Sequence, residues 1–122
     1  MKKLLLLLFS IFISFNSYGE WKHISTNVVG DNFYIEVDTI WERDGYVYFR
    51  FMTDFLKPTE GMMSNQIYTQ VDCEILRSKF LTFTSYEQSM GKSKMHTMTL
   101  PEQWRYPTPG NVFYELIYYI CN

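Results

Sequence analysis

The two cysteines carry the most definite chemistry in this chain. Cys73 and Cys121 are its only cysteines, they stand far apart, and neither belongs to a C-x-x-C motif. In a small exported chain, an even cysteine count indicates a disulfide in preference to a metal site or a redox motif. The sequence therefore predicts one covalent link between the middle of the chain and its last residue but one.

Catalytic chemistry has few candidates. The chain contains two histidines, His23 and His96, and a serine nucleophile would need one of them as its base. No G-x-S-x-G turn is present, and the acidic residues are scattered singly along the chain. We therefore predict that the protein is not an enzyme and that it requires no cofactor.

One group of side chains has the character of a soft-metal site. Met90, Met95, His96 and Met98 lie close together in the sequence, and thioether and imidazole groups are ligands for Cu(I). The simpler interpretation is that the methionines fill space in the core and that the histidine is solvated. The sequence leaves copper binding open as a side test, and we predict no metal site.

A stripe of aromatic and cationic residues points to protein contact. Tyr46, Tyr48 and Arg50 alternate on one face of a strongly β-prone segment and are of types enriched at protein interfaces. Lys92 and Lys94 lie near a predicted hairpin turn, where they could meet an acidic partner. Packing against a neighbouring element is the alternative for the stripe, and ordinary solvation is the alternative for the lysines. These five residues are the candidate protein-binding residues.

The N-terminal residues predict export. Lys2 and Lys3 precede an apolar run that is too short to cross a bilayer, and small residues ending at Gly19 offer a signal-peptidase site. We expect residues 1–19 to be a signal peptide and residues 20–122 to form a single domain. No lipobox cysteine follows the predicted cleavage site, which favours a periplasmic or released protein over a lipid-anchored one.

Charge and composition limit the kinds of partner. Without the two lysines of the predicted signal peptide, nine Lys and Arg face thirteen Asp and Glu, a dispersed net charge of about −4. This balance argues against a nucleic-acid partner. No further apolar segment is long enough to span a membrane. Aromatic residues make up 19% of the chain, which suits a sheet or a binding surface.

Hydrophobic periodicity predicts an α+β fold, with about six antiparallel strands and a C-terminal helix tethered by the disulfide. Val47, Phe49 and Phe51 are expected on the core face of their strand, and Met52 is expected on the opposite face with the aromatic stripe. Residues 57–61 contain proline and glycine and are expected to form a loop. The expected strands cover residues 21–25, 33–37, 46–53, 65–75, 79–86 and 95–100.

The last segment changes period. Apolar residues recur at intervals of three and four over residues 112–120, as on one face of a helix, and either Thr108 or Asn111 could cap it. A terminal strand is the alternative, because the last of these residues are also β-prone. In the helical interpretation, Cys121 joins the end of the helix to a strand that carries Cys73 on its buried side.

Several segments, taken together in their order and spacing, are similar to one known family. They are Trp21-Lys22-His23-Ile24, the run from Phe33 to Ile40, Val71-Asp72-Cys73-Glu74, Trp104, Pro109-Gly110-Asn111 and the closing Ile120-Cys121. In these segments the chain resembles the surface-adhesin protein E family over essentially the whole predicted mature region. The resemblance implies an antiparallel sheet of about six strands with a disulfide-tethered C-terminal helix. For the founding members it also implies binding of host extracellular-matrix and serum proteins at the bacterial surface.

Two departures accompany this resemblance. The namesake adhesins look lipid-anchored, whereas no lipobox cysteine is found here, and Asn111 stands where the family usually has serine. Both asparagine and serine can cap a helix, so the second departure preserves the local chemistry.

We therefore expect an exported, non-catalytic binding module with a protein partner, which the resemblance identifies as a host extracellular-matrix or serum protein. The alternative is a periplasmic structural or envelope-associated protein with no host partner, which the missing anchor favours. The expected location is the periplasm, the cell surface or the external medium. An exposed edge strand also makes a homodimer a reasonable expectation.

Overall fold

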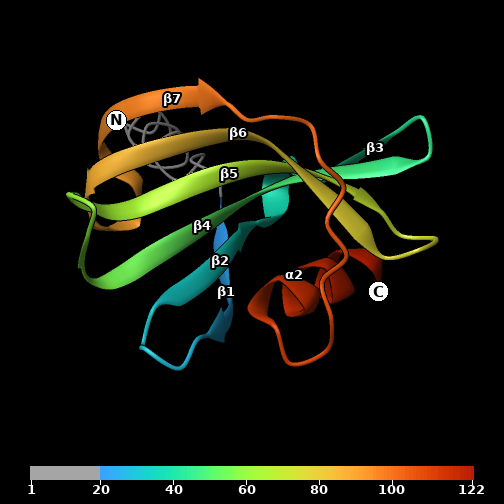
Figure 1. Cartoon of the computed structure of the whole chain (residues 1–122), viewed down its shortest axis with the longest axis horizontal. Coiled ribbons are helices and arrows are strands. Elements are labelled where there is room, and N and C mark those ends of the chain that lie inside the picture. Colours follow the sequence, from blue (N-terminus) through green and yellow to red (C-terminus); the bar gives the residue numbers. More distant parts are fainter. Residues whose placement is uncertain (1–19) are drawn as a thin grey trace, which may run out of the picture.

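One antiparallel sheet with a helix packed on one face makes up the part of the chain that the structure, a computed structural model, describes: residues 20–122 (Figure 1). The predicted signal peptide, residues 1–19, lies outside the described residues. The strands are β1 (Trp21–Thr26), β2 (Asn32–Glu36), β3 (Trp41–Arg43), β4 (Tyr46–Thr59), β5 (Met62–Asp72), β6 (Arg77–Gln88) and β7 (Lys92–Thr99). Two short 3-10 turns, η1 (Val37–Thr39) and η2 (Ser89–Gly91), and the helix α2 (Val112–Cys121) complete the described elements.

The strand order is β1-β2-β4-β5-β6-β7, and every pairing is antiparallel. Strand β3 extends the sheet beside the first part of β4, where Trp41 lies opposite Tyr48. The three long central strands are rich in the aromatic and β-branched residues that favour extended backbone. This arrangement confirms the predicted antiparallel sheet with one C-terminal helix.

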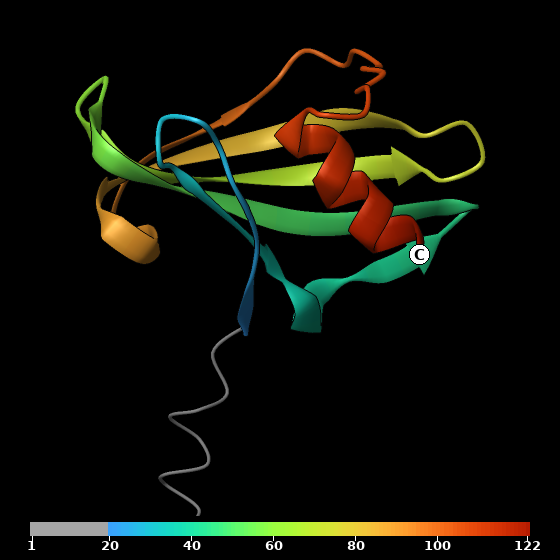
Figure 2. The ribbon, with the colours of Figure 1, turned by 90° about the horizontal axis from the view of Figure 1, so that it is seen from below.

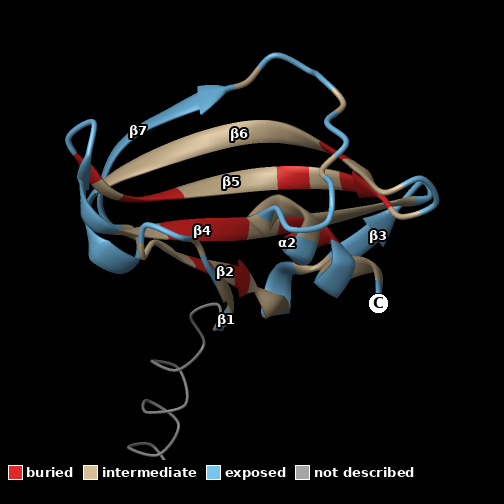
Figure 3. Ribbon diagram, turned by 60° about the horizontal axis from the view of Figure 1, so that its bottom comes forward, coloured by how far each residue is buried: buried red, intermediate tan, exposed pale blue. Residues whose placement is uncertain are grey.

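The hydrophobic core lies between α2 and the sheet (Figures 2 and 3). Phe49 and Phe51 of β4 are buried there with Leu116 and Ile117 of α2. The Phe113 ring meets the rings of Phe33 in β2 and Phe80 in β6 edge-on, at centroid distances of 6.1 and 5.6 Å. The predicted core face of β4 is therefore confirmed, with Val47 partly buried against this cluster.

The C-terminal element is a helix, as its periodicity predicted. The Asn111 side chain accepts a hydrogen bond from the Phe113 backbone N–H at 2.8 Å, which satisfies one of the free donors of the first turn. Asn111 is therefore the N-cap, and the alternatives of a Thr108 cap and of a terminal strand are wrong. Thr108 instead accepts a backbone hydrogen bond from the Asn111 N–H at 3.1 Å.

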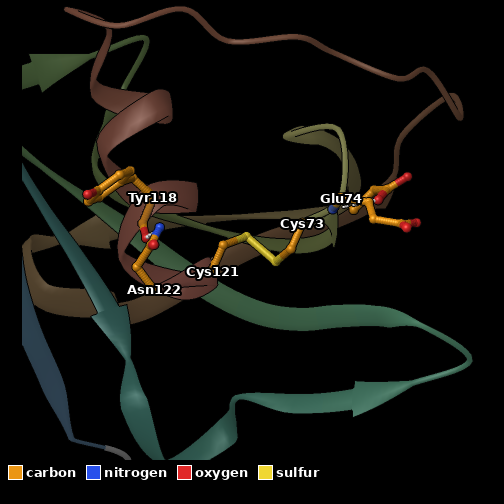
Figure 4. The surroundings of a disulfide bond; sticks show 6 residues. Cys73, Glu74, Tyr118, Cys121 and Asn122 are labelled. Carbon is orange, nitrogen blue, oxygen red and sulfur yellow. Dashed lines mark hydrogen bonds between the residues drawn. A yellow bond between two sulfur atoms is a disulfide. The ribbon is translucent and has the colours of Figure 1, made fainter.

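The predicted disulfide joins the end of α2 to the sheet. Cys73 and Cys121 are bonded, with their Cα atoms 5.5 Å apart (Figure 4). Both half-cystines pack against the core cluster. Beside the bond, the Asn122 side chain donates to the Tyr118 carbonyl at 2.9 Å and closes the last turn of the helix. The helix is thus capped at both ends and covalently fastened at one.

Several strand boundaries differ from the predictions: β4 ends later, β5 ends earlier, β7 begins at Lys92 and not at residue 95, and β3 was not predicted as a strand. Residues 57–59 were expected in a loop, but β4 continues through Pro58 to Thr59. Proline is tolerated there because the ladder between β2 and β4 stops at the pair of Asn32 and Asp54, so the outer part of β4 has no partner strand on that side. The register of this part of β4 with β5 is also irregular. Only Glu60 and Gly61, both at positive φ, form the turn to β5.

Strand β5 ends three residues earlier than expected. The Asp72 carboxylate accepts hydrogen bonds from the Glu74 N–H at 3.1 Å and from Arg77 Nε at 3.0 Å, and these bonds turn the chain toward β6. Cys73 therefore lies in the turn after β5 and not within the strand, although its side chain still packs on the core. Ile75, expected on the buried side, is 55% exposed.

The face of the sheet away from α2 is covered at one end by η2. Met52 lies on this face, as predicted, but it is 0% exposed because η2 folds over it. The Asp54 carboxylate accepts from Ser89 Oγ at 2.6 Å and from the Met90 N–H at 2.9 Å. Ser64 Oγ accepts from the Gly91 N–H at 2.9 Å. These contacts fix the reversal between β6 and β7 that the sequence predicted around Met90 and Gly91.

Candidate functional site

The rest of the face away from α2 carries a band of aromatic and cationic side chains, which we call the aromatic face. Alternation along β4 places Tyr46, Tyr48 and Arg50 there, because Phe49 and Phe51 point to the helix. The neighbouring strands and the segment before α2 supply the remaining members. The aromatic face consists of Trp41, Tyr46, Tyr48, Arg50, Tyr68, Arg77, Lys79 and Trp104.

Three rings from three strands form the centre of the aromatic face. Tyr48 and Tyr68 stack with their centroids 6.1 Å apart, and the Trp41 ring lies 5.7 Å from that of Tyr48. The Trp41 indole N–H donates to the Tyr68 hydroxyl at 2.9 Å, so the two outer rings are also hydrogen-bonded. Trp41 nevertheless remains 47% exposed. The rings are thus held in place while offering a large surface to solvent.

Arg50 lies beside this centre with its charge partly balanced. Its guanidinium group is 5.7 Å from the centroid of the Tyr68 ring, and it forms an ion pair of 3.7 Å with Glu36. Its side chain is still 42% exposed. Partial burial raises the pKa of nearby Tyr86, with Arg50 lowering it and Glu36 raising it further. These groups together form a polar, half-buried edge to the aromatic centre.

Trp104 anchors the other end of the aromatic face. Its ring packs 5.8 Å from that of Tyr46, with the Arg77 guanidinium at 3.9 Å and the Lys79 ammonium at 4.5 Å from the Trp104 ring. Arg77 also bonds Asp72 at 3.0 Å. A hydrogen bond with Tyr106 is the main cause of a raised pKa at Arg77, which burial opposes and Asp72 reinforces. The segment that leads to α2 is therefore held to the sheet by cation–π contacts.

The two candidate lysines lie apart from the aromatic centre. Lys92 and Lys94 belong to strand β7 and not to the turn, and both are exposed. Lys94 lies opposite Tyr86 in the register of β6 and β7, and Lys92 lies opposite Gln88. Because β5 and β6 separate them from β4, these lysines can contribute only at the rim of the aromatic face.

The sequence singled out three members of the aromatic face and missed the other five. Tyr68 could have been included, because it alternates on the outward side of the strand predicted over residues 65–75. Trp104 carried no local signal of this kind. The position of Trp104 depends on the long-range bridge between Ser78 and Arg105. Trp41 lies in the hairpin of β3 and β4, which turns at Asp44 and Gly45, and this Asp-Gly pair was a local signal for it.

The two histidines lie on opposite edge strands. His23 of β1 is hydrogen-bonded through Nε2 to Thr26 and Asn32, each at 3.0 Å. His96 of β7 is exposed and lies opposite Ser85, with exposed Met98 two residues further on the same strand. Within residues 20–122 no group of three or more His, Cys, Asp or Glu side chains is placed to hold a metal ion. The structure thus does not bring the two histidines together at one site.

No helix formed by residues 20–122 combines the length and the apolar character needed to cross a membrane.

Comparisons with known proteins agree with this architecture. The family model of the surface-adhesin protein E matches residues 21–122. Among solved structures, crystal form II of Haemophilus influenzae protein E aligns with a TM-score of 0.63 and 17% identity, over 83% of this chain and 86% of that chain. Protein E from non-typeable Haemophilus influenzae aligns with a TM-score of 0.61 and 17% identity, over 83% of this chain and 74% of that chain. No curated protein matches the chain.

The structural alignments, at this low identity, show a shared fold. The family model goes further, because it covers all but one of the residues that the structure describes. The order of strands, the bond between Cys73 and Cys121 and the capped terminal helix agree with the resemblance found in the sequence. The chain belongs to the surface-adhesin protein E family.

Proposed function

We propose that this protein is an exported, non-catalytic adhesin that binds a protein partner through its aromatic face. The observation that carries the proposal is the arrangement of exposed Trp41 with partly exposed Tyr48, Tyr68 and Arg50 on the sheet face away from α2. Tryptophan, tyrosine and arginine dominate the binding energy of protein interfaces. Membership in a family of surface adhesins supports the same kind of role and a location outside the cytoplasm.

The contacts within the aromatic face suit it to binding. A flexible side chain loses rotamer freedom when a partner immobilises it, and this loss weakens association. Here the Trp41 ring is already fixed by its hydrogen bond to Tyr68, and Arg50 is held by Glu36. A partner would therefore meet aromatic surface that is largely ordered before the encounter.

The charges around the aromatic face favour a partner segment with acidic character. Lys79 and Arg77 lie over the Trp104 ring at one end, and Lys94 lies at the rim on β7. Only Arg77 among these three forms an ion pair with another described residue. We infer that the partner is a host extracellular-matrix or serum protein, in keeping with the family resemblance.

Direct binding measurements test this proposal. The purified exported protein is passed over immobilised fibronectin, laminin and vitronectin in a surface plasmon resonance experiment. Trp41→Ala should weaken binding to the recognised ligand by about 30-fold, because central aromatic truncations at interfaces commonly cost about 2 kcal/mol. Tyr118→Ala, at an exposed tyrosine of α2, is the matched control and should leave the affinity unchanged.

Two results would contradict the proposal in different ways. Absence of binding to all three ligands would count against a host partner and would favour a periplasmic structural or envelope-associated protein. Equal loss of affinity in Trp41→Ala and Tyr118→Ala would count against the aromatic face as the contact surface. Surface labelling of native cells adds an independent check, because recovery only from the periplasm would also exclude a host partner.

The predicted homodimer belongs to the same proposal. Strand β7 is an edge strand of the sheet and is exposed along its whole length (Figure 3). An edge of this kind can pair with the edge of a second copy. We expect sedimentation to detect dimers at high protein concentration, and a strictly monomeric protein would contradict this part.

A further inference from the structure

A pocket of about 290 Å³ opens on the helix side of the sheet, away from the aromatic face. Ser78 and Phe80 of β6 form one wall, and Phe113 of α2 faces them. The segment before α2 completes the lining with Arg105, Tyr106, Pro107 and Asn111. The pocket is therefore bounded by two stretches of the chain that are distant in sequence, β6 and residues 105–113.

Ser78 brings a hydroxyl group to the wall of this pocket. The residue is 2% exposed, and it lies opposite core residue Val71, so its side chain points to the helix side. Its backbone N–H and C=O are both bonded to Arg105, at 2.9 and 2.8 Å. None of the side-chain hydrogen bonds of residues 20–122 involves its hydroxyl, and the one fully buried unpaired side-chain atom in that range is Asn65 Oδ1, so the Ser78 hydroxyl is accessible from the pocket. Because it has no partner within the described residues and lines the pocket, this hydroxyl is available to a ligand.

Arg105 supplies a positive charge next to that hydroxyl. Ser78 and Arg105 form a directly paired bridge, so their side chains project on the same side of the sheet. The Arg105 guanidinium group lies 4.9 Å from the centroid of the Phe80 ring. It takes part in none of the ion pairs among residues 20–122, and no acidic side chain lines the pocket. The polar wall of the pocket therefore offers donors and positive charge.

The opposite side of the pocket is aromatic. The rings of Phe80 and Phe113 meet edge to face at 5.6 Å, and Pro107 adds a further apolar surface. A volume of about 290 Å³ lies at the lower limit for small-molecule sites. It suits a single ring or a short branched chain, and it is too small for a long acyl chain.

We propose that this pocket binds a small carboxylate that carries a compact aromatic or apolar group. The carboxylate accepts hydrogen bonds from the Ser78 hydroxyl and from the Arg105 guanidinium, while the apolar group packs against Phe80 and Phe113. Charge-assisted bonds of this kind are the stronger class of hydrogen bond. The same chemistry is offered by a free aromatic acid and by the C-terminal carboxylate of a peptide that ends in an aromatic residue.

Titration of the purified, isotope-labelled protein with phenylacetate tests the proposal by heteronuclear NMR. We expect saturable shifts of the Ser78, Phe80, Arg105 and Phe113 amide signals at up to about 10 mM ligand, a range that detects millimolar affinity. Phenylacetamide, which has the same ring and no charge, should bind at least about tenfold more weakly. A parallel titration with N-acetylphenylalanine distinguishes the sources, because a site for peptide C-termini should prefer it to phenylacetate.

Variants make the test specific. Arg105→Gln should weaken phenylacetate binding about tenfold and Ser78→Ala several-fold. Arg43→Gln is the matched control, because Arg43 is an exposed arginine of β3, and it should bind as the wild type does. Absence of saturable shifts in the wild type, or equal binding of phenylacetate and phenylacetamide, would overturn the proposal. The comparison of phenylacetate with phenylacetamide uses the wild type alone, so it remains valid even if a pocket variant fails to fold.

Discussion

On the α2 side of the sheet, the rings of Phe51, Phe80 and Phe113 meet one another at 5.6 to 5.8 Å, and a single cation–π contact among residues 20–122 reaches them, from Arg105 to Phe80 at 4.9 Å. On the aromatic face, the rings of Tyr68 and Trp104 are met by guanidinium and ammonium groups. Both faces are rich in aromatic residues, and β4 contributes to both by simple alternation. The two faces therefore differ in what surrounds the rings, and not in how many rings there are.

This difference separates folding from binding. Phenylalanine has no polar atom, so its removal from water under α2 stabilises the fold without further conditions. The side chains of tyrosine, tryptophan and arginine carry polar groups that can hydrogen-bond to water or to one another at the surface, as Trp41 and Tyr68 do. Such a surface can be ordered and still be accessible to a partner. The predictions below test whether stability is concentrated on the α2 side.

The largest expected effect follows loss of the disulfide that fastens the α2 side. The bond between Cys73 and Cys121 closes a loop with a sequence separation of 48. In the chain-entropy model such a bond stabilises the fold by about 4 kcal/mol. The double variant Cys73→Ser/Cys121→Ser should lose about that much free energy of unfolding in urea. A loss below about 1 kcal/mol would show that packing alone holds α2 on the sheet.

Matched truncations on the two faces make the comparison direct. Leu116 of α2 is 1% exposed, and Leu116→Ala should reduce the free energy of unfolding by about 3 kcal/mol. Tyr48 is only half-buried, and Tyr48→Ala should cost about 1 kcal/mol through lost ring contacts. Urea unfolding of both variants gives the two values. If Tyr48→Ala proved as costly as Leu116→Ala, the aromatic face would be a second core.

Much of this comparison was available from the sequence. Alternation over β4 predicted which of its residues face the helix, and the period of three and four predicted α2 with Asn111 among its possible caps. The cysteine count predicted the disulfide. These features depend on local periodicity, on local capping chemistry or on a strong covalent rule, all of which can be recognised in one sequence.

The errors have other origins. β5 ends early because Asp72 bonds both Glu74 and Arg77, and nothing in the local pattern requires those bonds. β4 passes through Pro58 because β2 is too short to pair with that part of it. Met52 is buried because η2, far along the chain, folds over it. The first error is therefore a local turn, made by bonds of Asp72 to residues a few positions further on, whereas the other two depend on how segments distant in sequence meet.

The contacts of η2 offer a smaller test, because η2 covers one end of the sheet face away from α2. Asp54→Ala removes the acceptor for Ser89 Oγ and for the Met90 N–H. We expect a loss of about 1.5 kcal/mol in the free energy of unfolding, since the carboxylate makes charge-assisted bonds at a partly exposed position. Glu102→Ala, at an exposed acidic residue in the segment before α2, serves as the control and should stay within about 0.5 kcal/mol of the wild type. A similar change in both variants would mean that η2 is held by packing and not by Asp54.

The smallest expected effect concerns Tyr86, whose phenol is partly buried at the edge of the aromatic face and not fully exposed to solvent. Burial raises the pKa of Tyr86 above its usual value of 10.0, although Arg50 opposes the shift. A raised pKa means that the folded protein binds this proton more tightly than the unfolded chain does. The resulting stability is therefore fully present below pH 10 and is lost as the pH rises through the folded-state pKa. The free energy of unfolding should fall less steeply above pH 10 in Tyr86→Phe than in the wild type, and the same measurement on Tyr118→Phe corrects for the loss of one phenol. If the free energy of unfolding fell with the same slope above pH 10 in the wild type and in Tyr86→Phe, the Tyr86 phenol would be as exposed to solvent as an ordinary surface tyrosine.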